Sequence, residues 1–167
     1  MRLLAALLTS LLLAAAPVRA EPFDPPGLER DAQAYQRQIA QRAPAGGNAQ
    51  ARRQAEQAAD AAIRKQDWAA AVAALETRIA QGDAQAAHWA ALSAAQSKRA
   101  PPDNKRALEA AWRVYGMTED GPDKIRALVA IAEAARRADR PIVVVGALES
   151  AAEQAPAYVD YQRYRAA

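Results

Sequence analysis

Alanine supplies 48 of the 167 residues of this chain, whereas glycine supplies 7 and phenylalanine 1. Alanine has the highest helix propensity of the natural residues, and glycine has one of the lowest. Strands favour β-branched and aromatic side chains, and only 5% of the residues here are aromatic. The composition therefore predicts an all-α fold of single-domain length and argues against a β-sandwich or a barrel.

Cysteine is absent from the sequence, and the single histidine is His88. Disulfides, thiolate nucleophiles, iron–sulfur clusters and cysteine zinc sites all need cysteine, and a metal site needs three or four converging ligands. The sequence also lacks the GxxxxGK[ST] and GxGxxG patterns of phosphate-binding loops. We therefore expect no catalytic residues, no metal site and no cofactor, and we predict that the protein is not an enzyme.

The first twenty residues have the pattern of a secretory signal peptide. Arg2 provides a charged start, an almost unbroken apolar run covers residues 3–16, and small residues precede a cleavage point after Ala20. The run is too short for an ordinary transmembrane helix. We predict a periplasmic or secreted chain with no stable membrane insertion after cleavage. The alternative is an uncleaved N-terminal anchor.

The charge balance argues against a nucleic acid partner. Cleavage after Ala20 removes Arg2 and Arg19, which reduces 22 basic side chains to 20 against 19 acidic ones, a net charge of about +1. A nucleic-acid-binding protein needs a basic face that contacts several phosphates, whereas acidic and basic residues are interspersed along every segment here.

Turn and capping signals divide residues 21–167 into helices. Prolines predict an extended start, after which Leu28, Ala32, Tyr35 and Ile39 recur at helical spacing in one short helix. A Pro/Gly-rich loop with Asn48 as the next N-cap completes residues 21–48. Six helices of about 12 to 16 residues are expected from residue 49 onward. Their separators are Asp67, Gly82-Asp83, Pro101-Pro102-Asp103, Gly121-Pro122 and Asp139-Arg140-Pro141.

These helix pairs resemble tetratricopeptide repeats. Ala59 and Ala71 are small residues twelve apart, Leu75 follows four positions later, and Ala107 and Val144 recur at spacings of 36 and 37 residues. The second unit matches the tetratricopeptide pattern at Trp89, Leu92, Ser93, Ala107 and Ala111. The third unit matches it at Leu128, Ile131, Ala132, Val144, Leu148, Ala151 and Pro156. The resemblance implies an α-solenoid of about three hairpins over residues 49–167. Residues 158–165 predict the start of another helix, so we expect the array to be incomplete at its C-terminus.

Large apolar residues beside the small ones form the predicted core. They are Leu75, Trp89, Leu92, Leu128, Ile131 and Leu148. Trp68, Trp89 and Trp112 are expected at packing or hairpin-closing positions, and the alternative is an aromatic platform for a ligand.

The alternative hypothesis, that the chain is an enzyme, depends on three titratable residues. Glu56 and Asp60 are four apart on one helical face, where like charges usually face solvent, although an acid pair would have the same spacing. His88 could act as a base, and its alternative role is structural. This hypothesis predicts that all three lie together in one pocket.

The tetratricopeptide resemblance also implies a partner-binding groove, because the first helix of each pair lines the concave face in such arrays. The groove positions are Arg53, Arg64, Lys98, Arg126, Glu133, Arg136 and Arg137. The guanidinium groups of Arg136 and Arg137 suit a peptide carboxylate or acidic side chains. For each residue the alternative is an ordinary solvated side chain.

A second resemblance covers nearly the whole chain. Residues 23–32, 44–47, 68–71 and 106–112 are similar to the N-terminal helical region of exported bacterial alpha-2-macroglobulin-family proteins. Those proteins are large protease traps, and their thioester residues have no counterpart here. The resemblance implies a non-enzymatic interaction or scaffold module of an endopeptidase inhibitor, whose partner is a protein, a peptide or the downstream domains of the same polypeptide. The alternatives are a free-standing periplasmic tetratricopeptide adaptor binding peptides or proteins, and an architectural spacer without a ligand.

Overall fold

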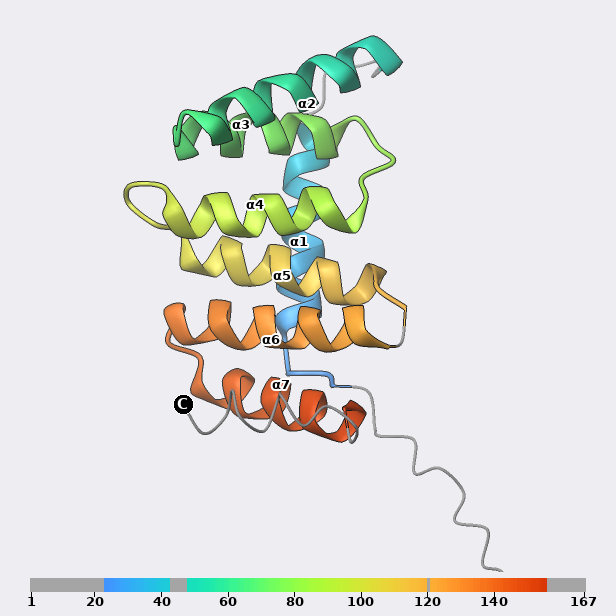
Figure 1. The fold of residues 1–167 in the computed structure, drawn as a ribbon, viewed down its shortest axis with the longest axis vertical. Helices are drawn as coiled ribbons and strands as arrows, with labels where there is room; N and C mark the ends of the chain where they lie inside the picture. Colours follow the sequence, from blue (N-terminus) through green and yellow to red (C-terminus); the bar gives the residue numbers. More distant parts are fainter. Residues whose placement is uncertain (1–22, 43–47, 120, 156–167) are drawn as a thin grey trace, which may run out of the picture.

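The computed structural model describes residues 23–42, 48–119 and 121–155, and the predicted signal peptide and the predicted helix start at 158–165 lie outside these ranges. The described residues form seven α-helices and no strand, which confirms the predicted all-α fold (Figure 1). The helices are α1 (Leu28–Gln41), α2 (Ala49–Arg64), α3 (Trp68–Ala80), α4 (Ala86–Lys98), α5 (Asn104–Met117), α6 (Pro122–Arg137) and α7 (Pro141–Gln154). None of these helices has the length and apolarity that crossing a membrane requires.

Local capping chemistry sets where most of the helices begin. The side chains of Asn48, Asp67 and Asp103 each accept a hydrogen bond from the backbone N–H three residues later. Each such bond satisfies one of the four N–H groups that a helix start leaves without a partner. Pro122 and Pro141 occupy the first position of α6 and α7, where the missing N–H costs nothing. The predicted separators at these five positions are confirmed.

Helices α2 to α7 pack in chain order, and α1 runs across the stack against α3 and α5 (Figure 1). Small residues lie where helices meet, since Ala71, Ala107 and Ala147 have no exposed surface. Small side chains at such contacts let helix axes approach to about 8 to 10 Å. The described helices are therefore packed pairs, as predicted, with one additional helix laid across them.

Helix α1 links two clusters of buried residues. Its apolar stripe is fully buried, with Leu28, Ala32, Tyr35 and Ile39 each at most 1% exposed. Leu28 and Ala32 belong to the cluster formed with α5, α6 and α7, whereas Tyr35 and Ile39 belong to the cluster formed with α2, α3 and α4. A single amphipathic helix thus joins the two halves of the core.

Most of the predicted core residues are buried, and α7 departs from the predicted register. Leu75, Trp89, Leu92, Leu128, Ile131 and Trp112 are buried. Val144 and Leu148 are only partly buried, because the face of α7 turned toward the core runs through Val143 and Ala147 instead. Trp68 is also partly buried, under the Nζ atom of Lys98 at 4.7 Å from its ring centre. The described structure thus places these tryptophans in packing positions.

Candidate partner-binding site

The residues predicted to line a groove lie on α2, α4 and α6. Exposed members are Arg53, Arg64, Lys98, Arg126, Arg136 and Arg137, whereas Glu133 is half-buried. Some of these side chains have local partners, because Arg126 pairs with Asp123 on its own helix and Lys98 lies over Trp68. Arg137 differs in that it lines a pocket shared with two other basic residues.

This pocket lies between the loop that joins α4 to α5 and the turn that joins α6 to α7. Its volume is about 430 Å³. Arg99, Lys105 and Arg137 contribute its basic side chains, and Asp103 and Asp139 contribute its carboxylates. We call these five residues the basic pocket. Three cations from two segments of the chain, residues 99–105 and 137–139, therefore line one hollow.

The start of α5 forms the floor of the basic pocket. Asp103 caps the helix by accepting a hydrogen bond from the backbone N–H of Arg106 at 3.0 Å, and its own N–H donates to the carbonyl of Gln96 at 2.9 Å. The Asn104 side-chain amide donates to the carbonyl of Arg137 at 2.8 Å, which ties α5 to the end of α6. Because the Asp103 carboxylate already occupies the partly positive N-terminus of α5, any attraction of this pocket for an anion comes from its three cations.

Two buried polar atoms beside the basic pocket have no hydrogen-bond partner among the described residues. They are Oδ1 of Asn104 and Nε of Arg99. An unpaired buried polar atom ordinarily costs about 1 to 3 kcal/mol. Four more such atoms lie elsewhere among the described residues, in Arg78, Gln81, Gln96 and Arg113. The atoms of Asn104 and Arg99 belong to residues that line the same hollow.

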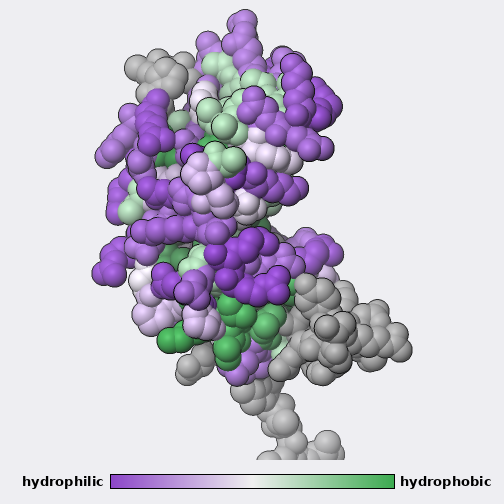
Figure 2. Space-filling view, turned by 90° about the vertical axis from the view of Figure 1, so that its left-hand side faces the viewer, coloured by the Kyte–Doolittle hydropathy of each residue, from purple (hydrophilic) through white to green (hydrophobic). Residues whose placement is uncertain are grey.

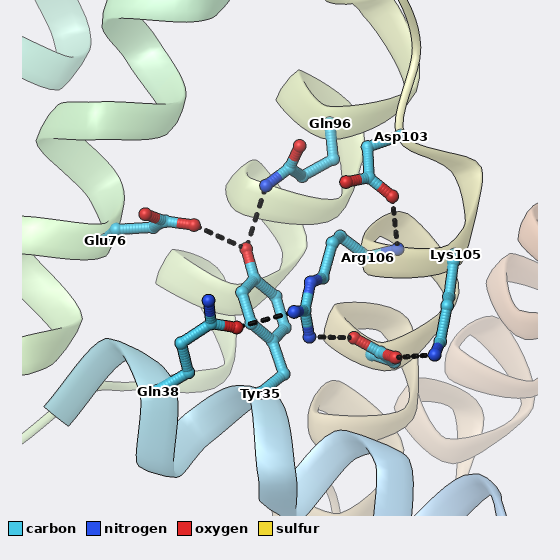
Figure 3. Close-up of polar contacts among 8 residues, drawn as sticks. Tyr35, Gln38, Glu76, Gln96, Asp103, Lys105 and Arg106 are labelled. Atoms are coloured by element: carbon cyan, nitrogen blue, oxygen red, sulfur yellow. Dashed lines mark hydrogen bonds and ion pairs between the residues drawn. The ribbon is translucent and has the colours of Figure 1, made fainter. Parts of the chain in front are cut away.

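A buried polar network lies behind the basic pocket and centres on Tyr35 of α1 (Figure 3). The Tyr35 hydroxyl donates to Oε1 of Glu76 at 2.8 Å and accepts from Nε2 of Gln96 at 2.8 Å. Burial and the adjacent Glu76 carboxylate raise the pKa of Tyr35 far above its ordinary value. This hydroxyl therefore stays protonated and connects α1 to both α3 and α4.

Arg106 extends the network from α1 to α5. Its guanidinium lies 4.3 Å from the Tyr35 ring centre, donates to the side-chain oxygen of Gln38, and donates to Oε2 of Glu109 at 2.8 Å. Glu109 is 2% exposed, and burial raises the pKa of its carboxyl despite the opposing Arg106 charge. Nζ of Lys105 lies 3.8 Å from Oε1 of Glu109, so Lys105 belongs to both the network and the basic pocket.

Two of the three residues of the enzymatic hypothesis, Glu56 and His88, lie close to each other, and none of the three lines a pocket described here. Nε2 of His88 lies 3.9 Å from Oε1 of Glu56, while Asp60 is exposed on α2. Nδ1 of His88 accepts a hydrogen bond from the backbone N–H of Gln85 at 3.0 Å, so the imidazole helps to cap α4. Burial, followed by the charge of Arg78, lowers the pKa of His88 and favours its neutral form. Within the described ranges, no three His, Cys, Asp or Glu side chains are grouped as a metal site requires.

Sequence analysis missed Arg99 and Lys105 in the basic pocket. A signal for them exists, because the Pro101-Pro102-Asp103 separator is flanked by basic residues on both sides. The groove positions were carried over from first helices alone, whereas this pocket is built from the loops between helices. No protein-family model, curated protein or solved structure matches the chain.

Proposed function

We propose that this chain is a non-enzymatic protein-interaction module that binds an acidic segment of a partner through the basic pocket. The convergence of Arg99, Lys105 and Arg137 at the start of α5 is the observation that carries the proposal. Guanidinium and ammonium groups form charge-assisted hydrogen bonds with carboxylates, which are roughly twice as strong as neutral ones. A peptide carboxylate or a run of Asp and Glu side chains has the matching chemistry.

Tetratricopeptide-like architecture is the second part of the proposal. The proposed repeat register makes Ala71 and Ala107 equivalent. In support of it, both lack exposed surface, and the helices between them pack in chain order. A helical-hairpin array presents loops at its edges and holds them at fixed spacing, which suits a scaffold. In this arrangement the basic pocket occupies one loop edge.

The wider setting of the module is also a proposal. We infer an exported protein whose signal peptide is cleaved after Ala20, and a parent polypeptide of the alpha-2-macroglobulin family in which the partner is a downstream domain. The support is the sequence pattern of residues 1–20 and the similarity of residues 23–32, 44–47, 68–71 and 106–112. N-terminal sequencing of the exported protein should begin at Glu21. A first residue of Met1 would instead favour the uncleaved anchor.

The protease-trap setting makes a separate prediction about activity. The helical chain has no bait or thioester residues to carry over, so it should leave trypsin and elastase cleavage of small and large substrates unchanged. Inhibition by the purified chain would contradict its proposed role as a scaffold region. A partner encoded separately would favour the free-standing adaptor.

Charge reversal in the basic pocket tests acidic-partner binding. The probe is a fluorescent peptide of alternating Glu and Gly, followed by anisotropy, with a Gln-for-Glu peptide as control. Arg99→Glu with Arg137→Glu should weaken binding by roughly tenfold or more, because each reversal replaces a charge-assisted hydrogen bond with repulsion. The matched variant, Arg30→Glu with Arg37→Glu on α1, changes exposed residues outside both the basic pocket and the predicted groove, and it should bind like the unmodified protein.

Equal weakening by both double variants would show a general charge effect and overturn the pocket assignment. A periplasmic pull-down with Arg136→Glu/Arg137→Glu extends the test to natural partners. Unchanged recovery there would leave the spacer hypothesis in place of partner binding. Circular dichroism should confirm that every variant remains helical.

A further inference from the structure

A second pocket lies on the opposite edge of the stack from the basic pocket. Figure 1 shows the α4–α5 and α6–α7 connections on one edge and the α3–α4 and α5–α6 connections on the other. The edge with the basic pocket faces the viewer in Figure 2, and its surface is mainly hydrophilic across the middle of the stack. The second pocket lies between α1, the α3–α4 turn, the start of α4 and the end of α5, and its volume is about 360 Å³. We call it the Arg113 pocket, because Arg113 is the one basic residue among those that line it.

The walls of the Arg113 pocket combine buried apolar residues with one exposed apolar side chain. Ile39, Ile79 and Trp89 line it and are each at most 7% exposed. Met117 also lines it and is 41% exposed, on the same face of α5 as Arg113, because residues four apart align along a helix. Methionine is flexible and adapts its shape to apolar groups packed against it. The pocket therefore offers apolar surface that a ligand can cover.

Arg113 brings an incompletely paired positive charge to this pocket. Its side chain is 22% exposed, and its Nη1 atom lies 3.8 Å from Oε1 of Glu29, whereas a charge-assisted hydrogen bond is about 2.7 to 2.9 Å long. Its Nε atom is buried and has no hydrogen-bond partner among the described residues. Asp83, the one carboxylate among the lining residues, pairs with Arg52, which does not line the pocket. The guanidinium of Arg113 is therefore the charge that the pocket presents to a ligand.

The oxygens of Glu29 already accept hydrogen bonds from other groups. Nε2 of Gln33 donates to Oε1 at 2.6 Å, and Nε1 of Trp112 donates to Oε2. The guanidinium of Arg113 also lies 5.9 Å from the ring centre of Trp89, within the range of a cation–π contact. Glu29 and Trp89 thus hold the guanidinium in place, while its five N–H donors leave capacity for a further acceptor.

We propose that the Arg113 pocket binds a small organic acid, in which one carboxylate is joined to an apolar body such as a phenyl ring. The two carboxylate oxygens match the planar fork of the guanidinium. The apolar body lies against Met117, Ala80 and Ala84, which line the same hollow. Small-molecule sites have volumes of about 300 to 1,000 Å³, so this pocket suits a ligand at the small end of that range. The site is separate from the basic pocket and is independent of the proposed acidic partner.

Titration of the purified protein with 3-phenylpropionate, followed by nuclear magnetic resonance of the backbone amides, tests this site. The signals of Gly82 and Ala84, which line the Arg113 pocket, should shift with a dissociation constant of about 1 mM or lower. Acetate has the charge without the apolar body, and 3-phenylpropionamide has the same body without the charge. Each of these controls should bind at least about tenfold more weakly, because the pocket requires both parts of the ligand.

Two sets of variants test the named residues. Arg113→Gln should weaken binding by about tenfold or more, whereas Arg64→Gln, which removes the same charge from an exposed position on α2, should leave it unchanged. Met117→Glu and Met117→Lys remove the same apolar contact from an exposed position, so neither is expected to affect folding. The Glu variant should bind about tenfold more weakly than the Lys variant, because it places a carboxylate beside the ligand's own. This pair keeps the test valid if Arg113→Gln does not fold.

Three results would overturn the proposal, each in a different way. Equal binding of 3-phenylpropionate and its amide would show that the charge of Arg113 has no role. Equal binding by Met117→Glu and Met117→Lys would place the acid elsewhere on the molecule. Shifts at Asn104 and Arg137 with both acids, and none at Gly82 and Ala84, would show that carboxylates bind the basic pocket through charge alone. Binding of the acidic peptide is measured separately, so failure of this site leaves that proposal standing.

Discussion

Helices α2 and α7 form the two ends of the stack and present opposite surfaces. The exposed side of α2 carries Arg53, Glu56, Asp60 and Arg64, a mixture of charges that water solvates well. The exposed side of α7 instead carries an apolar pair at its N-terminal half. Arrays of helices usually end in a polar capping helix. Among the described residues, the α2 end therefore has the polar surface of a capping helix, whereas the α7 end exposes Ile142 and Val145.

The contacts that hold α1 and the chain before it also differ between the two ends of the stack. Toward α2, α1 is held by the directional hydrogen bonds of Tyr35 with Glu76 and Gln96. Toward α7, Nε1 of Trp112 donates a hydrogen bond to Glu29 of α1, and the chain before α1 is held by ring packing, with Phe23 at 5.7 Å from Trp112 between ring centres. Hydrogen bonds require one alignment of the groups, whereas apolar packing accepts several of similar energy. The attachment through Tyr35 is therefore expected to be stricter than the attachment through Phe23.

The largest expected effect comes from removing a tryptophan from either half. Trp89 is 2% exposed in the α2 half and Trp112 is 6% exposed in the α7 half. Each substitution to alanine should destabilise the protein by about 3 to 5 kcal/mol, because it leaves a large cavity. Urea unfolding measures the loss, and hydrogen exchange shows which helices open. Local opening of only the half that contains the substitution would show that the two clusters unfold separately, whereas global opening would show that α1 couples them.

Overpacking at a helix crossing tests the register of the stack. Ala71 has no exposed surface, so Ala71→Leu should cost about 1 to 3 kcal/mol in the α2 half. Ala147→Leu should cost a similar amount in the α7 half, where Ala147 is equally buried. Ala73 is exposed on the same helix as Ala71 and serves as the control. An unchanged melting temperature for Ala71→Leu would contradict the observed register.

Removing the Tyr35 hydroxyl allows a comparison between attachment by hydrogen bonds at Tyr35 and attachment by apolar packing at Phe23. Tyr35→Phe leaves Gln96, which is 2% exposed, without its acceptor, and this should cost about 1 to 3 kcal/mol. Phe23→Leu at the other end retains apolar packing and should cost less than about 1.5 kcal/mol. Thermal unfolding of the two variants under identical conditions measures the difference. A larger loss of stability from Phe23→Leu than from Tyr35→Phe would contradict the expectation that the Tyr35 attachment is the stricter one.

The smallest expected effect is a pH dependence at His88, near the α2 end. Burial lowers its pKa in the folded protein. Below the unfolded value of about 6.5, the unfolded chain therefore binds a proton that the folded protein does not yet bind. Stability should fall as the pH decreases through this range and then level off below the folded pKa. Buried Glu109, whose pKa is raised, acts in the opposite direction, so the comparison is with His88→Gln rather than with the absolute curve.

Much of the fold could be predicted because its causes are local. The side chains of Asn48, Asp67 and Asp103 cap the helices that follow them, and a cap needs only the residue and the three positions after it. The stripe of Leu28 and Ile39 also follows from spacing alone, and both are buried as that spacing predicts. The register of α7 was harder to predict from the sequence, because Val143 and Val144 are equally apolar. Only the contact of α7 with α6 decides which of the two faces the core.

The candidate site is harder to predict, because its residues meet only through packing. Arg99, Lys105 and Arg137 are exposed or half-exposed cations like many others in the sequence until α4, α5 and α6 bring their ends together. Charge type and helix ends can be read along the chain, since each depends on neighbours within a few residues.

The position of α1 shows most clearly where that local information ends. Its amphipathic stripe requires a buried face but does not specify which helices cover it. The choice depends on Tyr35 meeting Glu76 and Gln96, residues 41 and 61 positions away. Such groups find one another only in the folded chain, because their hydrogen bonds stabilise α1 only after α3, α4 and α5 have packed and excluded water from between them.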